Sequence, residues 1–235
     1  MNCPDSIGPN PAREPLGSLL PPVLFVDDWL IVVDKPAGLL SVAGRGPAGE
    51  DCVHARLCQR WADARVVHRL DMSTSGLMVF ARSAEAQRRL SRAFAERAVE
   101  KHYVAVVAGM PRAQNIDAKG WASIDLPLAA DWPARPRQKV DAEHGRPSLT
   151  RWRIAGGSPG VWGEGTRVEL RPVTGRSHQL RVHLTAIGHP IVGDALYAPE
   201  QLATASPRLL LHAERLALPH PADGRRMEWH SGTPF

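Results

Sequence analysis

Residues 67–76 have the sequence Val67-His68-Arg69-Leu70-Asp71-Met72-Ser73-Thr74-Ser75-Gly76, with a short apolar run on either side. The two runs, residues 66–67 and 77–81, are typical of short buried strands. The segment between them is therefore expected to be a loop on a rigid support, which presents Arg69 and Asp71. The small polar residues after Asp71 offer hydroxyl and amide donors that would keep its carboxylate ionised.

The same loop also has a purely structural interpretation. An Asp followed by Ser, Thr and Gly often forms an Asx-turn, in which the side chain only organises the local backbone. From the loop alone, an Asx-turn is the simpler interpretation of Asp71. Evidence from other segments is needed to choose between this turn and a functional carboxylate.

Composition limits the classes of protein to consider. The chain has 235 residues, 43% of them hydrophobic, which is enough for one sizeable core. Its 29 Lys and Arg residues against 24 Asp and Glu give a net charge of +5, which favours a polyanionic partner. The N-terminal residues lack the pattern of a signal peptide, and no apolar run approaches the roughly 18 residues of a membrane span. We therefore expect a cytoplasmic protein without membrane association.

Proline content and hydrophobic spacing divide the chain into expected segments. Four prolines predict a flexible tail over residues 1–20, followed by one domain over residues 21–235. Helices are expected over residues 51–62 with Asp51 near the N-cap, and after Ser83 and Ser177 as N-caps. Residues 111–147, apart from 123–128, and the tail from Pro219 are expected to be irregular. Apolar runs predict strands at residues 29–34, 101–107, 149–154, 166–171 and 209–212.

Three other segments have residues that suit a binding site, and each also has a structural interpretation. Tyr103 either forms the wall of a site or is a core ring. Arg176 precedes an expected helix N-terminus, where Arg and free amides could hold an anion. Residues 132–139 combine an aromatic ring with three cations, which suits either a nucleic-acid surface or a rigid basic loop. His178 and His183 are five residues apart, the wrong spacing for one helical face, so a metal site is not expected.

Taken together, four segments resemble the RluA family of RNA pseudouridine synthases. The catalytic signature matches His68-Arg69-Leu70-Asp71 followed by Thr74-Ser75-Gly76. The resemblance covers residues 23–235, and residues 125–140 and 207–214 resemble members that modify both 23S rRNA and tRNA. Besides the catalytic signature, the four segments include three that occur in the same order as in the family. They are Lys35-Pro36-Ala37-Gly38-Leu39, Lys101-His102-Tyr103-Val104-Ala105, and Arg171-Pro172-Val173-Thr174-Gly175-Arg176-Ser177-His178-Gln179-Leu180-Arg181-Val182-His183.

The resemblance implies a fold and an activity. The fold is α+β, with a mixed, mostly antiparallel central sheet flanked by helices and loops and a central active-site cleft. The activity is isomerisation of uridines to pseudouridine in stem-loops of 23S rRNA and of the tRNA anticodon arm. It implies no metal and no other cofactor, and we expect a monomer without an obligate protein partner. An S4-type RNA-binding domain is not expected, because about 20 residues precede the first strand.

The resemblance also implies roles for single residues. Asp71 is the nucleophile or base, Arg176 pairs with it, and Tyr103 stacks on the target uracil. Arg69 occupies the space that the flipped base leaves, and His68 is expected to be structural. The expected RNA contacts are Arg69, Arg135, Arg137, Lys139 and Arg181.

Three other functions fit the residues less well. A glycosidase with an Asp nucleophile needs a second carboxylate as acid, and no other carboxylate lies in these motifs. A non-catalytic RNA-binding relative is expected to have lost Asp71, Tyr103 or Arg176, and all three are present. A serine hydrolase using Ser73 or Ser75 would need a G-x-S-x-G elbow, which the chain lacks here.

Overall fold

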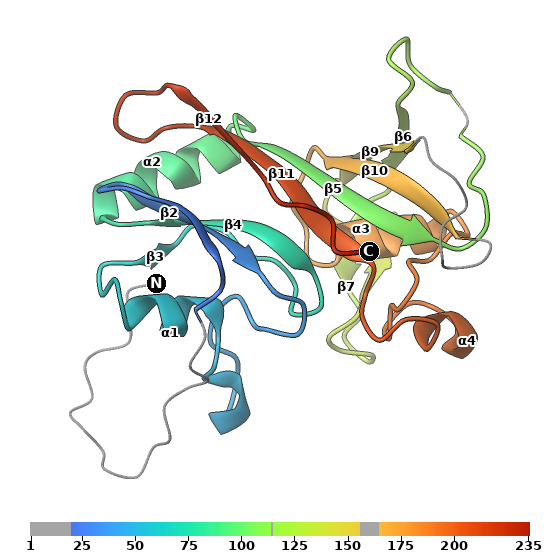
Figure 1. Cartoon of the computed structure of the whole chain (residues 1–235). Helices are drawn as coiled ribbons and strands as arrows, with labels where there is room; N and C mark the ends of the chain where they lie inside the picture. The colour runs from blue at the N-terminus through green and yellow to red at the C-terminus, as the bar shows by residue number, and fades with distance from the viewer. Residues whose placement is uncertain (1–19, 114, 156–164) are drawn as a thin grey trace. The chain divides into compact units, whose positions relative to one another are not determined.

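The computed structural model describes residues 20–113, 115–155 and 165–235, and the chain divides into two compact units (Figure 1). Unit 1 comprises the chain up to Val99 together with Arg215–Ser231, and unit 2 comprises Glu100–Glu214 and Gly232–Phe235. The tail expected over residues 1–20 lies, apart from residue 20, outside the described residues. A single domain over residues 21–235 stays a prediction.

Unit 1 is built on antiparallel strands with a helix on each side. β2 pairs with β1 and β4, β3 pairs with β4, and β12 pairs with the end of β11. Its elements are β1 (Val23–Val26), β2 (Leu30–Lys35), a 3-10 turn (Pro47–Gly49), α1 (Val53–Cys58), β3 (Arg65–Val66), β4 (Ser75–Ala81), α2 (Ala84–Ala95), the end of β11 (Leu211–Pro219) and β12 (Arg226–His230).

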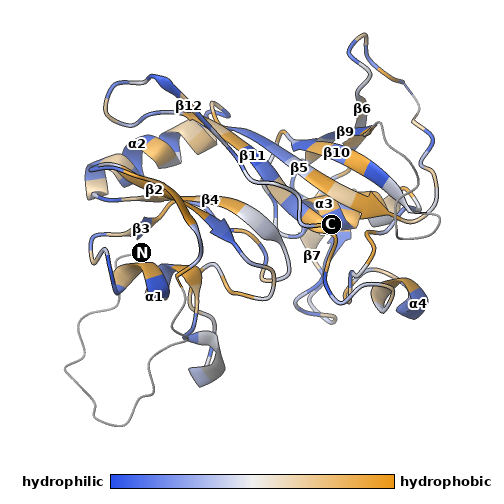
Figure 2. Ribbon diagram, in the orientation of Figure 1, coloured by the Kyte–Doolittle hydropathy of each residue, from blue (hydrophilic) through white to orange (hydrophobic). Residues whose placement is uncertain are grey.

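The core of unit 1 lies on both faces of β2 and β4. On one face, Leu30 and Val79 belong to a cluster with Leu90 of α2. On the other face the ring of Phe80 stacks on that of His54 in α1, with centroids 6.3 Å apart. Figure 1 accordingly shows α1 and α2 on opposite sides of these strands, which Figure 2 colours as hydrophobic along most of their length. Burial of both faces explains why the two strands appear in the sequence as continuous apolar runs.

The starts of the two helices in unit 1 were predicted with unequal success. Ser83 caps α2 as expected, because its Oγ accepts a hydrogen bond from the Ala86 amide at 3.0 Å. Asp51 was expected near the N-cap of α1 and lies next to it, but it does not cap the helix itself. Cys52 is the cap, and its Sγ accepts from the Ala55 amide at 3.3 Å. Asp51 instead binds Arg56 through both carboxylate oxygens.

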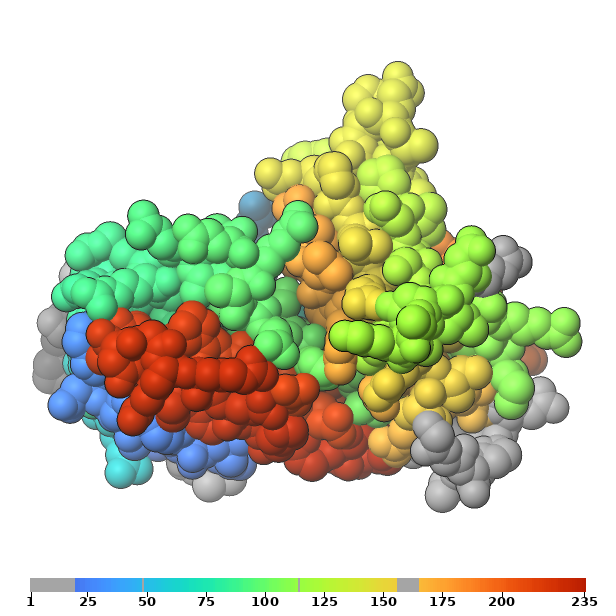
Figure 3. Space-filling model, turned by 90° about the horizontal axis from the view of Figure 1, so that it is seen from above, coloured from blue at the N-terminus to red at the C-terminus, as the bar shows by residue number. Residues whose placement is uncertain are grey.

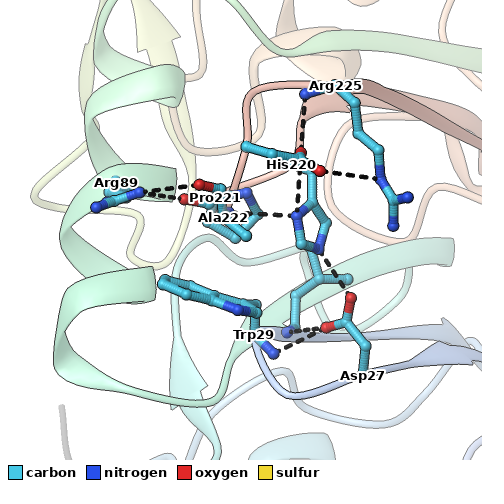
Figure 4. Close-up of polar contacts among 9 residues, drawn as sticks. Asp27, Trp29, Arg89, His220, Pro221, Ala222 and Arg225 are labelled. Carbon is cyan, nitrogen blue, oxygen red and sulfur yellow. Dashed lines mark hydrogen bonds and ion pairs between the residues drawn. The ribbon is translucent and has the colours of Figure 1, made fainter.

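The turn between β11 and β12 is fixed to the start of β2 and to α2. Asp27 accepts hydrogen bonds from the amides of Trp29 and Leu30 through Oδ1 and contacts His220 Nε2 through Oδ2 at 2.8 Å (Figure 4). Arg89 of α2 donates to the carbonyl of Pro221 at 2.7 Å. α2 and this hairpin therefore lie side by side, as the space-filling view also shows (Figure 3).

Unit 2 is an antiparallel sheet in the order β5-β10-β9-β6, with a separate β7–β8 hairpin. Leu180 and Leu184 of α3 pack into its core with Val168, Leu170 and Trp152. Its elements are β5 (Glu100–Val107), β6 (Ala122–Asp125), β7 (Leu128–Ala130), β8 (Gln138–Val140), β9 (Leu149–Ile154), β10 (Thr166–Pro172), α3 (Gln179–Ala186), α4 (Glu200–Ala203) and the start of β11.

Two regions expected to be irregular contain strands. β7 and β8 have three residues each, too short to give an alternating pattern. β12 follows Pro219 and alternates exposed with half-buried residues, and its charged composition hid it. All strand pairs reported for the two units are antiparallel, which agrees with the expected α+β class. Within the described residues, no helix is long and apolar enough to cross a bilayer.

Candidate active site

The loop that carries Asp71 is fixed by Lys35, a fully buried residue at the end of β2. Lys35 Nζ donates to the carbonyl oxygens of Pro36, Leu39 and Met72, at 2.9, 2.8 and 3.0 Å. An ammonium group offers three donors, so one Lys35 side chain can bind several carbonyl oxygens at once. The carbonyl of Met72 also accepts from the Gly38 amide at 2.8 Å. Lys35 thus joins the turn after β2 to the residue that follows Asp71.

Ser41 fixes the residue on the other side of Asp71. Its hydroxyl donates to the carbonyl of Leu70 at 2.6 Å and accepts from the amide of Leu70 at 3.1 Å. Ser41 and Leu70 are both buried. The backbone is therefore held at Leu70 and at Met72, which restricts the position of the half-buried Asp71 between them.

The backbone of the loop is closed by a hydrogen bond of its own. The Thr74 amide donates to the main-chain carbonyl of Asp71 at 3.1 Å, which closes a backbone turn. Thr74 and Ser75 are buried. The Asp71 loop therefore combines a tight turn with the two clamps, and a turn and a functional role are compatible.

The two residues before Leu70 have different environments. His68 is structural, as expected, because its Nε2 accepts from the Val79 amide at 3.1 Å and its ring stacks on Phe94 at 4.7 Å. Arg69, in contrast, is exposed. The loop therefore anchors one side chain in unit 1 and directs the next to the surface.

In unit 2, Gln179 holds the turn that carries Arg176. Its Oε1 accepts from the hydroxyl of Thr174 at 2.7 Å and from the amide of Arg176 at 3.0 Å. Its Nε2 donates to the carbonyl of Leu149 at 3.0 Å and to the hydroxyl of Thr150 at 2.9 Å. A primary amide offers two donors and two acceptor positions, and this buried side chain uses all four.

The helix after this turn starts one residue later than predicted. Ser177 is exposed, and the N-cap of α3 is His178, whose φ of 54° lies in the left-handed region. No side-chain cap bond is made by His178. Its Nδ1 lies 2.6 Å from the hydroxyl of Tyr197 instead, so this contact to another segment replaces the usual cap. The guanidinium of Arg176, half-buried, donates through Nε to the carbonyl of Pro147 at 3.3 Å.

Tyr103 and Lys101 lie on the same strand, β5, with side chains on the same face by alternation. Tyr103 is half-buried and packs against the core of unit 2, with Leu170 as its partner in β10. A Cβ atom on Gly175 would lie 3.7 Å from Lys101 Nζ, so this ammonium borders the Arg176 turn. Burial lowers the pKa of Lys101. No role was assigned to Lys101 from the sequence, although the Lys101-His102-Tyr103 motif contains it.

The predicted RNA contacts fall into two groups. Arg135, Arg137 and Lys139 are exposed on the β7–β8 hairpin. Arg181 is buried, and its guanidinium forms two hydrogen bonds with the buried carboxylate of Asp194, at 2.8 and 2.6 Å. This ion pair joins α3 to the Asp194 turn, and an RNA contact by Arg181 stays a prediction.

No cluster of three or more His, Cys, Asp or Glu side chains that could hold a metal ion occurs among residues 20–113, 115–155 and 165–235. Asp71 belongs to unit 1, whereas Tyr103 and Arg176 belong to unit 2. The structure therefore describes two prepared segments, one around Asp71 and one around Arg176, each fixed by buried polar side chains.

Comparison with known proteins identifies the sequence family. The family described as RNA pseudouridylate synthase matches residues 29–186, more than half of the chain. The "Dual-specificity RNA pseudouridine synthase RluA" of Escherichia coli (strain K12) is 46% identical over 226 residues, which cover 96% of this chain and 97% of the relative. The protein of the same name from Vibrio vulnificus (strain CMCP6) is 49% identical over 200 residues, 85% of this chain and 78% of the relative.

A solved structure supports the same grouping. "Human RNA Pseudouridylate Synthase Domain Containing 1" superposes with a TM-score of 0.72 at 28% identity, and the match covers 91% of this chain and 84% of that one. The α+β fold implied by the sequence resemblance is thereby confirmed.

Proposed function

This chain belongs to the family of RNA pseudouridylate synthases, and on that premise we propose which RNAs it modifies and which residues it uses. It is an isomerase that binds RNA and converts uridine to pseudouridine. Its proposed substrates are stem-loops of 23S rRNA and of the tRNA anticodon arm, modified in the cytoplasm by a monomer. The proposed substrates are supported by 46% identity to a dual-specificity relative over 96% of the chain, because the likeness extends far beyond the Asp71 loop.

The reaction determines what the chain must supply. The glycosidic bond between N1 and C1′ breaks, the uracil turns while it is held, and C5 bonds to C1′. N1 gains a proton and C5 loses one, so substrate and product have the same composition. In this proposal, Asp71 acts as nucleophile or base, which requires an ionised carboxylate at a fixed position. The observation that carries the proposal is the double clamp at Leu70 and Met72, which restrains Asp71 on both sides.

The remaining roles follow from the family likeness. Tyr103 is the platform on which the target uracil stacks, and Arg176 is the charge partner of Asp71. A guanidinium suits that role because it remains cationic and binds carboxylates in a defined geometry. The four hydrogen bonds of Gln179 support the assignment, because they fix the turn that carries Arg176.

Asp71→Asn tests the catalytic assignment. The variant should lose pseudouridine formation while it still folds and binds RNA, because the amide keeps the shape but lacks the charge. Release of tritium from RNA labelled at C5 of uridine measures the reaction, and gel-shift titration measures binding. Asp28→Asn is the control, because Asp28 is an exposed aspartate of unit 1. Full activity in Asp71→Asn would overturn the catalytic assignment.

Arg69 is proposed to occupy the space left by the flipped base. Its exposure at the surface of the Asp71 loop suits this role, because a planar guanidinium can stack and donate hydrogen bonds together. Arg69→Ala should greatly slow modification of folded stem-loops and should slow that of an unstructured RNA less. Equal rates for variant and wild type on every folded RNA would contradict base flipping by Arg69.

The β7–β8 hairpin supplies the proposed contacts to the RNA backbone. Arg135, Arg137 and Lys139 are exposed cations on one short hairpin, which suits contact with phosphates. Arg181 is left out of this group because its guanidinium is bound to Asp194.

A further inference from the structure

The most exposed Phe, Trp or Tyr side chain of the described residues lies in the loop of the β7–β8 hairpin. Trp132 is 68% exposed. Side chains of this size usually bury most of their surface in the fold, so an exposed tryptophan costs favourable burial. The ring is therefore best explained by a partner that covers it.

The loop around Trp132 is ordered by its own hydrogen bonds. The Asp131 amide donates to the carbonyl of Arg137 at 3.0 Å and closes the loop. Within the loop, the amide of Ala134 donates to Asp131 and the amide of Arg137 to Ala134, at 3.1 and 3.0 Å. The position of Trp132 is thus defined by the protein alone, and a ligand would not have to order the loop.

One face of the Trp132 ring already has a planar cation on it. The guanidinium carbon of Arg135 lies 3.3 Å from the ring centroid, which is stacking distance. A base of RNA has the same flat shape and stacks on tryptophan or on guanidinium in the same way. Trp132 and Arg135 therefore form a preformed platform for a base that is not paired within a helix.

The surroundings of the platform favour RNA over an apolar protein surface. Arg135, Arg137 and Lys139 are exposed, and Lys139 contacts Asp141 at 3.4 Å. A ring flanked by cations matches a nucleotide, which has a flat base joined to a phosphate.

The base of the hairpin is tied to the helix that follows Arg176. Leu128 packs with Val182 and Tyr197 in a small buried cluster. The Tyr197 hydroxyl accepts from the Gln138 amide at 2.7 Å and lies 2.6 Å from His178 Nδ1. Tyr197 therefore connects the hairpin to the N-terminus of α3 and holds the platform at a fixed position relative to the Arg176 turn.

We propose that Trp132, together with Arg135, is a docking platform that stacks on one unpaired base of the substrate loop, other than the target uridine. The inference rests on the proposed function, in that the ligand is an RNA stem-loop. Stacking on this platform contributes to binding and not to the chemical step, because the hairpin contains none of the residues to which the proposed chemistry is assigned.

The test is Trp132→Ala, with Trp132→Phe as the conservative variant. A stem-loop RNA with 2-aminopurine at successive loop positions reports stacking through quenching of its fluorescence. Trp132→Ala should bind this RNA about tenfold more weakly, as expected for one lost base–aromatic stack. Trp132→Ala should also lose the fluorescence quenching at one loop position. Trp132→Phe should keep most of the RNA affinity and most of the quenching. The rate at saturating RNA should change less than about threefold, since the stack contributes to binding.

A second Arg–Trp pair provides the matched control. Arg60 lies over the ring of Trp61 at 4.8 Å in unit 1, so Trp61→Ala removes the same kind of pair from a segment other than the hairpin. This variant should bind the RNA like wild type. A paired duplex with the same stem should bind wild type and Trp132→Ala equally, because it has no unpaired base.

The outcomes separate this inference from the proposed function. Equal stem-loop affinities of wild type and Trp132→Ala would overturn the platform, even if pseudouridine is formed normally. Weaker binding by Trp61→Ala to the same degree would also overturn it, because the effect would not belong to the hairpin. If wild type instead binds through Trp132 but Asp71→Asn remains fully active, the platform stands and the catalytic assignment fails.

Discussion

Gln179 determines the position of Arg176 although it carries no charge and is buried. Replacing it with Met keeps the length of the side chain but removes four hydrogen bonds. The unpaired groups left behind should cost about 1–3 kcal/mol of unfolding free energy. Because the turn would lose the contacts that Gln179 makes to it and to β9, the rate at saturating RNA should fall more than the affinity for RNA changes.

The measurement for Gln179→Met is the separation of kcat from KM in the tritium-release reaction, alongside thermal unfolding. Gln87→Met is the control, because Gln87 makes a single bond to the carbonyl of Val66 and lies on α2. If Gln179→Met lowers stability but leaves kcat unchanged, Gln179 only stabilises the fold and does not position Arg176.

Single residues were predictable from the sequence where a motif contained them. Asp71 and Arg176 could be selected because their neighbours formed recognisable patterns. The clamp by Lys35 could not be derived, because its acceptors are main-chain carbonyls and one of them lies 37 positions away. A buried Arg181 also could not be foreseen, since its partner Asp194 is brought near only by the fold of α3 and the turn after it.

At the scale of elements, Asp27 connects the start of β2 to the β11–β12 turn. Burial raises the pKa of this carboxyl, but hydrogen bonds from Leu30, Trp29 and His220 outweigh burial and hold the pKa below its ordinary value of 3.8. A lowered pKa in the folded state means that the ionised form stabilises the fold above pH 3.8. This stabilisation is lost as the pH falls through the folded-state pKa.

Asp27→Asn should therefore destabilise the protein near neutral pH by about 1 kcal/mol, a modest value because the side chain is partly exposed. The difference from wild type should shrink when the pH drops below 3.8. Urea unfolding of wild type and Asp27→Asn at several pH values measures this difference in unfolding free energy. Asp223→Asn is the control, because Asp223 lies near the same histidine, 3.6 Å from its Nδ1, but is more exposed. A difference that stays constant down to acid pH would show that Asp27 acts without its charge.

Elements were predictable from hydrophobic spacing when they were long and buried on a face. β2, β4 and α2 have clear patterns because their neighbours cover them on defined sides. The β7–β8 hairpin was missed because its strands have three residues each, and β12 was missed because its residues are mostly polar and partly exposed. The hairpin now carries the proposed RNA platform, and its exposed cations Arg135, Arg137 and Lys139 suit that function.

At the scale of the whole molecule, the sequence predicted one domain, whereas contacts divide the chain into two compact units. Strand β11 runs from unit 2 into unit 1, so a simple cut along the sequence would not separate them. Spacing along the chain cannot reveal such an exchange, because it depends on which distant strands pair. The candidate residues are divided in the same way, with Asp71 in unit 1 and Tyr103 and Arg176 in unit 2.

The proposed dual specificity leads to a prediction about the whole molecule. If one Asp71 serves both RNAs, the rRNA and tRNA stem-loops must exclude each other. Each RNA should inhibit modification of the other competitively, with an inhibition constant equal to its own KM when chemistry is slower than release. Tritium release from one labelled RNA in the presence of the unlabelled second RNA measures this.

Variants make the competition experiment decisive. Asp71→Asn should abolish modification of both RNAs. Trp132→Ala should instead weaken the binding of both RNAs, and the loss of affinity should depend on how well each loop presents an unpaired base. Non-competitive inhibition, or a second RNA that is modified without Asp71, would mean that the two substrates use different sites. If both loops deliver a uridine to the same carboxylate, as proposed, the shared requirement is the shape of the loop, and sequences outside it should affect affinity more than rate.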